Sequence, residues 1–385
     1  MRSCSEIPSG SVVFLRAGMD VPLKDGKITD ASRIEETRPT IDLLRKKNCK
    51  IVLSTHIGRP AGTDPALSTK PIWSYLNQFY PTQYVPEVFG VRSHDAIAAL
   101  GPGEILLLEN LRYDEREEKN DPTFAEFLVH DVDSVVIDAY SNAHREHASM
   151  VGVLKYKPGY AGLLLQKELS MLQRLEHPEH PYVAIIGGAK ADKLDTIQGL
   201  LDHVDVVLVG GVLANTFLKA AGFSVGNSKT DDAKLDHAAR LYRTGKIIVP
   251  VDAVVADKFA ADAQSSVLPL GQISSGLILD IGPQTIARYT LFLSKAKTIV
   301  WGGPIGGFEW PQFSSGTKAI AKAVAESGAY TLAAGGDSGA ALVALGYKDK
   351  ISHVSTGGGV TLQLLEGKPL AAVVALEQNS KKTFS

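Results

Sequence analysis

The sequence predicts an α/β protein with two doubly wound parallel sheets, each at the centre of its own domain. Three observations lead to this fold class. The chain has 385 residues, enough for about two domains at roughly 150 residues each. Short apolar, β-branched runs alternate with longer amphipathic stretches, as expected of parallel strands whose two faces are covered by helices. Glycine-rich turns follow several of these runs, where a strand would pass into a helix. Together these patterns indicate two Rossmann-like domains.

The predicted strands fall into two arrays along the chain. The first array covers residues 12–15, 51–53, 105–108 and 135–137, and the second covers 183–186, 206–209, 247–249, 298–300 and 330–332. Between the arrays, a helical pattern over 164–172 runs into a Pro-containing segment at 176–181, which is typical of an interdomain connector. We therefore expect four parts: an N-terminal domain at 1–163, a helix and connector at 164–181, a C-terminal domain at 182–356, and a glycine hinge with a returning C-terminal segment at 357–385.

Composition and charge exclude several classes of protein. Lys and Arg number 40 against 42 Asp and Glu, and the resulting net charge of -2 argues against bulk binding to nucleic acid or to a membrane surface. Hydrophobic residues make up 44% and charged residues 21%, which excludes a disordered chain and a coiled coil. Residues 1–10 lack a signal-peptide pattern, and no apolar run reaches the roughly 18 residues of a membrane span. With only Cys4 and Cys49 present, we expect a cytoplasmic protein.

Cationic side chains gather near the predicted strand ends of the first array. They are Arg33, His56, Arg59, Arg112 and Arg145. The planar guanidinium fork of arginine suits carboxylate and phosphate oxygens. Each of these residues, taken alone, also fits the role of a surface ion-pair partner. That role is less fitting for segments 56–60 and 110–112, because each directly follows an apolar strand.

In the second array, glycine pairs follow four predicted strands, at residues 187–188, 210–211, 302–303 and 335–336. Glycine allows the backbone to approach a ligand closely, and the N-terminus of the following helix offers free N–H groups to phosphate. Any parallel sheet needs some tight turns, but several at one edge favour a nucleotide site. The sequence has neither a P-loop nor the H-R-D set of protein kinases, so nucleotide chemistry would use another scaffold.

In their order and spacing, these segments resemble the phosphoglycerate kinase family from about Val12 to Leu365. The matching segments of the first half are 21–23, 25–30 with Arg33, 56–60, 107–112, 138–140 and 143–145. Those of the second half are 187–190, 250–252, 280–283, 308–309, 316–320, 335–338 and 352–359. Each motif is modest alone, whereas the ordered set is highly specific.

The resemblance implies reversible phosphoryl transfer between ATP and the carboxylate of 3-phosphoglycerate, which gives ADP and 1,3-bisphosphoglycerate in glycolysis and gluconeogenesis. It implies that the five cations hold the phosphoglycerate in the N-terminal domain and that Arg33 takes part in catalysis. Positions Gly18 and Asp20 would also face this acceptor. The family is typically monomeric, so we expect a monomer with small-molecule substrates and with no nucleic-acid or membrane partner.

The resemblance further implies that the C-terminal domain binds the nucleotide as its Mg²⁺ complex. The residues implied are Lys190, Lys193, Gly211, Glu309, Gly335, Gly336, Asp337 and Ser338. The two lysines would act in catalysis. Glu309 would face the ribose, and Asp337 would face the metal.

The chemistry of the residues agrees with this division. A carboxylate acceptor, whose pKa is ordinarily near ~3.5, is ionised at pH 7, so its attack needs no general base. Catalysis then consists of positioning and of neutralising the charge on the transferring group. Substrates held on separate domains must be brought together by closure, which also excludes water. We expect hinge bending at the 164–181 connector and at the glycines near residue 357.

The acceptor half departs from the family pattern at two positions. The family reads R-x-D-x-N-x-P-L where this chain has residues 16–23, with Gly18 at the aspartate position and Asp20 at the asparagine position. In the family these two side chains contact the hydroxyl and carboxylate end of the acceptor. A carboxylate at residue 20 would repel the substrate carboxylate unless it is protonated or paired with an arginine.

The nucleotide half departs as well. The lysine motif is one residue shorter than in the family, so that Lys190 and Lys193 stand three residues apart. Gly302 and Gly307 replace an asparagine and a valine. Two interpretations remain open: an active phosphoglycerate kinase with compensating contacts, or a same-fold paralogue with an altered acceptor or little kinase activity beyond nucleotide binding.

Overall fold

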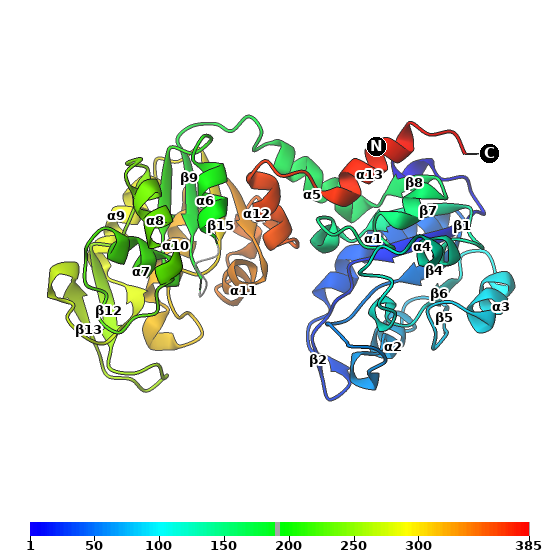
Figure 1. Ribbon diagram of the computed structural model, residues 1–385, viewed down its shortest axis with the longest axis horizontal. Helices are drawn as coiled ribbons and strands as arrows, with labels where there is room; N and C mark the ends of the chain where they lie inside the picture. The colour runs from blue at the N-terminus through cyan, green and yellow to red at the C-terminus, as the bar shows by residue number, and fades with distance from the viewer. Residues whose placement is uncertain (189–192, 385) are drawn as a thin grey trace. The chain divides into compact units, whose positions relative to one another are not determined.

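The computed structural model describes residues 1–188 and 193–384, apart from the side chains of residues 336 and 337. Contacts within the chain divide it into two compact units (Figure 1). Unit 1 comprises Met1–Ser170 together with Pro369–Ser385, and unit 2 comprises Met171–Lys368. The chain therefore passes between the units twice. Within the described residues, no helix is both long enough and apolar enough to cross a bilayer.

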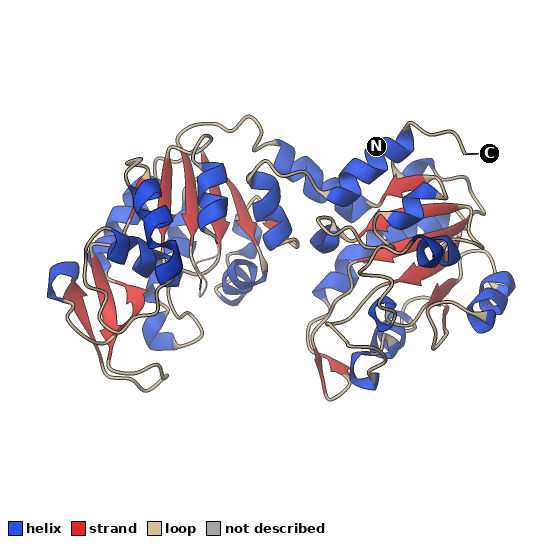
Figure 2. Cartoon of the chain, in the orientation of Figure 1, coloured by secondary structure: helices blue, strands red, loops and turns tan. Residues whose placement is uncertain are grey.

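Unit 1 is built on a six-stranded sheet in the order β5-β6-β4-β1-β7-β8, and every neighbouring pair is parallel (Figure 2). Its strands are β1 Val12–Ala17, β4 Lys50–Ser54, β5 Thr82–Tyr84, β6 Ile105–Leu107, β7 Ser134–Asp138 and β8 Gly159–Ala161. The helices are α1 Ser32–Lys46, α2 Lys70–Leu76, α3 Val91–Ala99, α4 Pro122–Leu128, α5 Leu163–Gln173, which continues into unit 2, and α13 Ala371–Ser380. A small hairpin joins β2 Leu23–Lys24 to β3 Lys27–Ile28.

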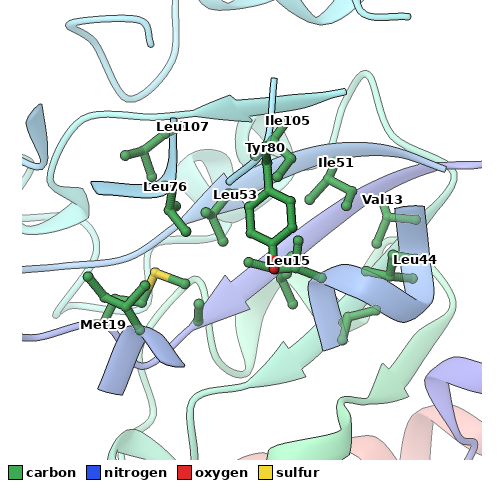
Figure 3. Close-up of a cluster of buried hydrophobic side chains, with 14 of the residues drawn as sticks. Val13, Leu15, Met19, Leu44, Ile51, Leu53, Leu76, Tyr80, Ile105 and Leu107 are labelled. Atoms are coloured by element: carbon green, nitrogen blue, oxygen red, sulfur yellow. The ribbon is translucent and has the colours of Figure 1, made fainter. Parts of the chain in front are cut away.

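The central strands of unit 1 are continuous apolar runs in the sequence because their side chains are buried in the core. Strand β1 pairs with β4 on one side and with β7 on the other, and residues 13–17 of it are buried. Figure 3 shows one side of this sheet, where Leu15 and Ile51 belong to the same buried cluster as Leu44 of α1 and Leu76 of α2. Burial of each such side chain contributes about 1.5–3 kcal/mol. The strand register is therefore fixed, and with it the position at which each strand ends.

Helix α13 joins unit 1 through Asn379, which is buried on its inner side. Its amide Nδ2 donates to Leu154 O at 2.7 Å and to Lys157 O at 2.9 Å. Its Oδ1 accepts from Gly159 N at 2.7 Å and from Arg2 Nη2 at 2.6 Å. One side chain thus ties the C-terminal helix to two parts of the first 170 residues.

Unit 2 holds a second six-stranded parallel sheet, in the order β11-β10-β9-β15-β16-β17, and a three-stranded antiparallel sheet, β13-β12-β14. The parallel strands are β9 Tyr182–Ile186, β10 Val206–Val209, β11 Ile247–Ile248, β15 Thr298–Gly302, β16 Tyr330–Ala334 and β17 His353–Ser355. The antiparallel strands are β12 Asp252–Ala256, β13 Ser265–Pro269 and β14 Leu277–Ile281. The helices are α6 Leu194–Leu200, α7 Gly211–Ala220, α8 Leu235–Tyr242, α9 Pro283–Leu293, α10 Ser315–Glu326, α11 Gly336–Ala344 and α12 Gly359–Leu365.

The predicted fold class is confirmed, and each of the nine predicted apolar runs overlaps a strand of a parallel sheet. Strands β5, β8 and β17 lie at sheet edges, have three residues each, and were not predicted. The antiparallel sheet was not predicted either: β13 is largely exposed, and β14, although residues 277–279 are apolar, is only partly buried. Parallel interior strands are apolar on both faces and are the easiest to find from sequence.

Candidate functional site

The sheet of unit 1 brings most of the predicted acceptor residues to one edge. Residues 18–20 follow β1, His56 follows β4, and Arg145 follows β7. Arg112 lies in a short 3-10 helix, Leu111–Tyr113, after β6. These strands are parallel neighbours, so their carboxyl ends meet at the same edge, which is the usual ligand-binding edge of such sheets. Arg33 reaches this edge from the first turn of α1.

Asp20 stands at the centre of this group. Its Oδ1 accepts a hydrogen bond from Gly58 N at 2.9 Å. Its Oδ2 lies 3.8 Å from Arg33 Nη1 and 3.8 Å from His56 Nε2, and Arg33 Nη1 also donates to Asp20 O at 2.7 Å. The carboxylate at this unusual position is therefore paired with an arginine. Pairing reduces the repulsion that it would exert on a substrate carboxylate.

Arg112 and Arg145 carry buried donors for which the described part of the chain provides no hydrogen-bond acceptor. Arg112 is 5% exposed, and its Nη1 donates to Gly58 O at 2.6 Å. Its Nε lies 2.9 Å from Glu118 Oε1, an ion pair without good hydrogen-bond geometry. Within the described residues, Arg112 Nη2 and Arg145 Nε are buried without a hydrogen-bond partner. Buried unsatisfied donors are costly, and an anion is the kind of acceptor that would satisfy them.

The electrostatics of this edge also favour an anion. Burial and the neighbouring guanidinium groups, Arg16 and Arg112 foremost, hold the pKa of His56 well below its usual value. Burial and the charge of Arg145 lower the pKa of Arg112. Cationic groups that destabilise one another's charge create a positive potential that a bound anion relieves. Arg59 differs from the others, because it lies on an exposed loop after β4.

The predicted glycine turns of unit 2 also meet at one edge, because β10, β9, β15 and β16 are consecutive in the sheet. Gly211 has φ +60 and begins α7, and a side-chain carbon there would lie 2.4 Å from Gly188 O. A side-chain carbon at Gly187 would lie 2.1 Å from Pro304 O. These glycines are therefore required by close packing between turns as well as by any ligand. Gly335, with φ +107, likewise faces Gly358 across the edge.

The structure describes some of the predicted nucleotide residues and not others. Lys193 Nζ donates to Gly187 O at 2.8 Å and to Gly302 O at 3.1 Å, so the ammonium group is held among the glycine turns. Ser338 Oγ is buried and donates to Ala334 O at 2.9 Å. Glu309 is exposed on the loop after β15.

Three of the predicted nucleotide residues lie wholly or partly outside the described part of the chain. Lys190 lies outside the described residues. Gly336 and Asp337 occupy the first turn of α11, and the Asp337 side chain is also outside the described part of the structure.

The glycines that replace family side chains differ in the space around them. A side-chain carbon at Gly18 would lie 3.3 Å from Ala139 Cα and 3.3 Å from Ser141 Oγ, so a larger residue requires a small shift. A side-chain carbon at Gly302 would lie 3.1 Å from Leu362 Cδ2. At Gly307 the nearest atoms would be 3.6 Å away, an ordinary contact distance.

A second group of polar residues, which was not predicted from the sequence, lies buried behind this edge of the unit 1 sheet. Arg16, Glu117 and Ser149 are buried and joined by hydrogen bonds, and His147 lies 3.7 Å from Glu117 through its Nδ1. Burial lowers the pKa of His147 to about 3, so this ring is neutral. Arg16 was detectable in principle, because it is a charged residue inside the apolar run of β1. Charged side chains are rarely buried unless they are paired or functional.

Comparisons with known proteins agree with this geometry. A family model described as phosphoglycerate kinase matches residues 6–368. A cytosolic phosphoglycerate kinase of Triticum aestivum is 45% identical over 384 residues, which cover 96% of each chain. A phosphoglycerate kinase of Chloroflexus aurantiacus is 44% identical with the same coverage. The solved structure of phosphoglycerate kinase from Coxiella burnetii is 38% identical, covers 99% of each chain and has a TM-score of 0.88.

Proposed function

This chain belongs to the phosphoglycerate kinase family, and from that membership we propose that it transfers a phosphoryl group reversibly between ATP and the carboxylate of 3-phosphoglycerate. The observation that carries the proposal within the structure is the cluster of buried and half-buried cations at one edge of the unit 1 sheet. None of the comparisons favours a paralogue with another acceptor.

We propose that the acceptor binds at the unit 1 edge, with its anionic groups held by Arg33, His56, Arg59, Arg112 and Arg145. The orphan donors of Arg112 and Arg145 support this assignment. Arg33 is the arginine paired with the Asp20 carboxylate, and its planar guanidinium group is suited to bidentate contact with a carboxylate. Asp20 would contact the acceptor hydroxyl in place of the family aspartate, after a backbone shift that the flexibility of Gly18 allows.

We propose that the nucleotide binds at the glycine edge of unit 2. Lys190 and Lys193 would contact the phosphates, Gly211 and the Gly335–Ser338 turn would line the site, and Glu309 would hold the ribose. Lys193 already lies among the turns, and its bonds to two carbonyl groups would be exchanged for phosphate oxygens. The N-terminus of α11 would offer its backbone N–H groups to the same phosphates.

Mg²⁺ would accompany the nucleotide, with Asp337 as its protein ligand. In proteins this ion is commonly held by one or two carboxylates together with substrate phosphates. Over the described residues, which do not include the Asp337 side chain, no cluster of three or more His, Cys, Asp or Glu side chains is arranged to hold a metal. When bound, it would neutralise part of the charge on the transferring group.

The reaction needs no proton transfer from the protein. The acceptor carboxylate is ionised near neutral pH and attacks the terminal phosphorus in line with the leaving ADP oxygen. The cations at the two edges bind and orient the reactants and offset their charges. The proposed acceptor and nucleotide sites lie on different units, and we propose that transfer involves hinge bending at the 164–181 connector and at the glycines near residue 357.

Localisation and assembly are part of the same proposal. Relatives with this similarity include proteins named cytosolic and one named chloroplastic. We propose that this chain acts in the cytoplasm, as the relatives named cytosolic do, and that it acts as a monomer, because each unit carries its own proposed ligand edge.

The test is an assay of the purified chain with Mg-ATP and 3-phosphoglycerate, in which the acyl phosphate product is trapped by hydroxylamine as its hydroxamate. We expect hydroxamate only when both substrates are present. Tight nucleotide binding without any hydroxamate would contradict the proposal and favour a nucleotide-binding paralogue.

A further inference from the structure

Behind the proposed acceptor edge, four buried side chains form a continuous set of hydrogen bonds that ends on His56. Ser149 Oγ donates to Glu117 Oε1 at 2.5 Å, and Ser149 N donates to Glu117 Oε2 at 2.9 Å. Arg16 Nε donates to Ser149 Oγ at 2.8 Å. At the far end, Arg16 Nη2 lies 3.0 Å from His56 Nδ1. All four residues are at most 2% exposed.

The chemistry of Arg16 fixes the direction of both bonds that it makes in this set. A guanidinium group has donors and no acceptor, so Ser149 Oγ must accept from Arg16, and Ser149 Oγ donates its own proton to Glu117 Oε1. For the same reason His56 Nδ1 must be the acceptor of the bond from Arg16 Nη2. A neutral imidazole with an unprotonated Nδ1 carries its proton on Nε2.

Other protonation states of His56 conflict with this arrangement. A proton on Nδ1 would place one donor against another at 3.0 Å in a buried site. A doubly protonated ring would, in addition, bring two cations together where water cannot screen them. Arg16 cannot turn away easily, because its Nε is held by Ser149 and its Nη1 donates to Ala17 O.

We propose that Arg16, anchored through Ser149 to Glu117, holds His56 as the neutral tautomer with its proton on Nε2, so that the ring offers the phosphoglycerate a hydrogen bond without adding a charge. Arg16, Ser149 and Glu117 are then positioning residues, and they act on the acceptor through His56. This inference rests on the acceptor site proposed above and specifies how one member of it works.

The other nitrogen of the ring is available for this task. His56 Nε2 lies 3.8 Å from Asp20 Oδ2, which is longer than a hydrogen bond, so its N–H can bond to a ligand oxygen. The charged or titratable groups that face the ring are Arg16 of β1, Arg112 after β6, Arg145 and His147 after β7, and Asp20 after β1. Burial and the first four disfavour a charged ring, and Asp20 is the acidic group that faces Nε2. We therefore expect His56 to stay neutral between pH 6 and pH 8.

The direct test is a long-range ¹H–¹⁵N correlation spectrum of the full chain labelled with ¹⁵N-histidine, with His56 assigned by the loss of its signals in His56→Gln. We expect one unprotonated nitrogen coupled to a single ring C–H proton and one protonated nitrogen coupled to both. The pattern should not change between pH 6 and pH 8. A proton on Nδ1, or titration to the doubly protonated ring within this range, would overturn the inference.

A pair of variants tests the anchoring. Ser149→Ala removes the link between Glu117 and Arg16, and we expect a mixture of His56 tautomers with a several-fold higher KM for 3-phosphoglycerate and a nearly unchanged kcat. Ser149→Thr keeps the hydroxyl and should restore both the spectrum and the KM. If Ser149→Ala leaves the His56 spectrum and the KM unchanged, Ser149 does not position the ring.

The same measurements separate this inference from the proposed function. If the chain binds 3-phosphoglycerate but carries the His56 proton on Nδ1, the inference about the tautomer is wrong and the proposed function is unaffected. If the proton is on Nε2 but the chain does not bind 3-phosphoglycerate, the proposed function is wrong. The hydrogen bond from His56 to the phosphoglycerate is then wrong as well.

Discussion

Asp20→Asn is expected to tighten the binding of 3-phosphoglycerate. Asp20 Oδ1 accepts from Gly58 N at 2.9 Å, and Oδ2 lies 3.8 Å from Arg33 Nη1. Asparagine keeps an oxygen for Gly58 N and removes the negative charge beside Arg33. The local fold should therefore persist while the repulsion on an incoming carboxylate is lost.

The size of this effect follows from the shared guanidinium group. A substrate carboxylate on Arg33 would lie on the order of 6 Å from the Asp20 carboxylate, which gives a repulsion of roughly 0.7 kcal/mol at a dielectric constant of about 80 and roughly 2.8 kcal/mol at about 20. The Asp20 side chain is 35% exposed, so solvent screening favours the lower part of this range. A gain of about 1 kcal/mol corresponds to a KM roughly fivefold lower. The repulsion acts on bound substrate and transition state alike, so kcat should change little.

Steady-state kinetics against 3-phosphoglycerate at saturating Mg-ATP measure this change. The difference in KM between the variant and the parent chain should shrink as salt is added, because added ions screen partly exposed charges. Asp30→Asn is the matched control: it removes the same charge from an exposed residue just before α1, where Asp30 Oδ1 accepts from Ser32 N at 2.8 Å. A KM that stays the same or rises in Asp20→Asn at low salt would refute the electrostatic reasoning.

Three further predictions concern catalysis, pH dependence and stability. Arg33→Ala should lower kcat/KM for 3-phosphoglycerate at least tenfold, since a lost charge-assisted bond costs about 1.5–3 kcal/mol, while the exposed control Arg92→Ala leaves it unchanged. Burial raises the pKa of Asp280 from 3.8 to about 7, so the native state retains a proton that the unfolded chain releases, and the free energy of unfolding should fall as pH rises through this interval. Asp280→Asn should remove that part of the pH dependence in denaturant titrations. Asn379→Ala should lower the free energy of unfolding by about 2–4 kcal/mol, because it leaves buried backbone groups unpaired.

Each of these predictions has a result that would contradict it. Unchanged kinetics in Arg33→Ala would remove this residue from the acceptor site. A pH profile of unfolding that is identical with and without Asp280 would show that its carboxyl group does not hold the proton. A loss below about 0.5 kcal/mol in Asn379→Ala, the range of ordinary surface substitutions, would show that α13 is held by other contacts.

The parallel sheets could be predicted from the sequence because their interior strands are apolar on both faces. Strand β1 contains Val12–Leu15 and β9 contains Val183–Ile186, and short runs of this kind are typical of strands buried inside a parallel sheet. Strand β13, Ser265–Pro269, could not be predicted in this way, because its side chains are mostly exposed and its pairing with β12 depends on residues distant in the sequence. Strand propensity depends on context more than helix propensity does.

The candidate site was predictable where a residue directly follows an apolar strand, as His56 and Arg112 do. The contacts between these residues were not predictable. That Asp20 lies between Arg33 and His56 is a consequence of strand order, which brings the ends of β1 and β4 together. The buried polar residues behind the edge were harder still to predict from the sequence. Arg16 is linked to residues 117 and 149, and its bond to Ser149 joins residues that are 133 positions apart in the chain.

The glycine turns of unit 2 allow neighbouring turns to pack closely, and they would also line the proposed nucleotide site. Their number at one sheet edge indicated a nucleotide site, whereas the structure shows that Gly211 and Gly187 are also required by the close approach of neighbouring turns. Both requirements act at the same positions. A substitution at either glycine would therefore perturb folding before it reports on nucleotide binding, and lysine or arginine substitutions are the better functional tests.

The most direct test of phosphoryl transfer by this chain is the formation of ATP from Mg-ADP and 1,3-bisphosphoglycerate by the purified protein. ATP is quantified by luciferase, and 3-phosphoglycerate is measured in the same samples. We expect one ATP for each 3-phosphoglycerate released and no ATP when either substrate is omitted. Release of 3-phosphoglycerate without ATP, or no reaction although both ligands bind, would contradict the proposed function.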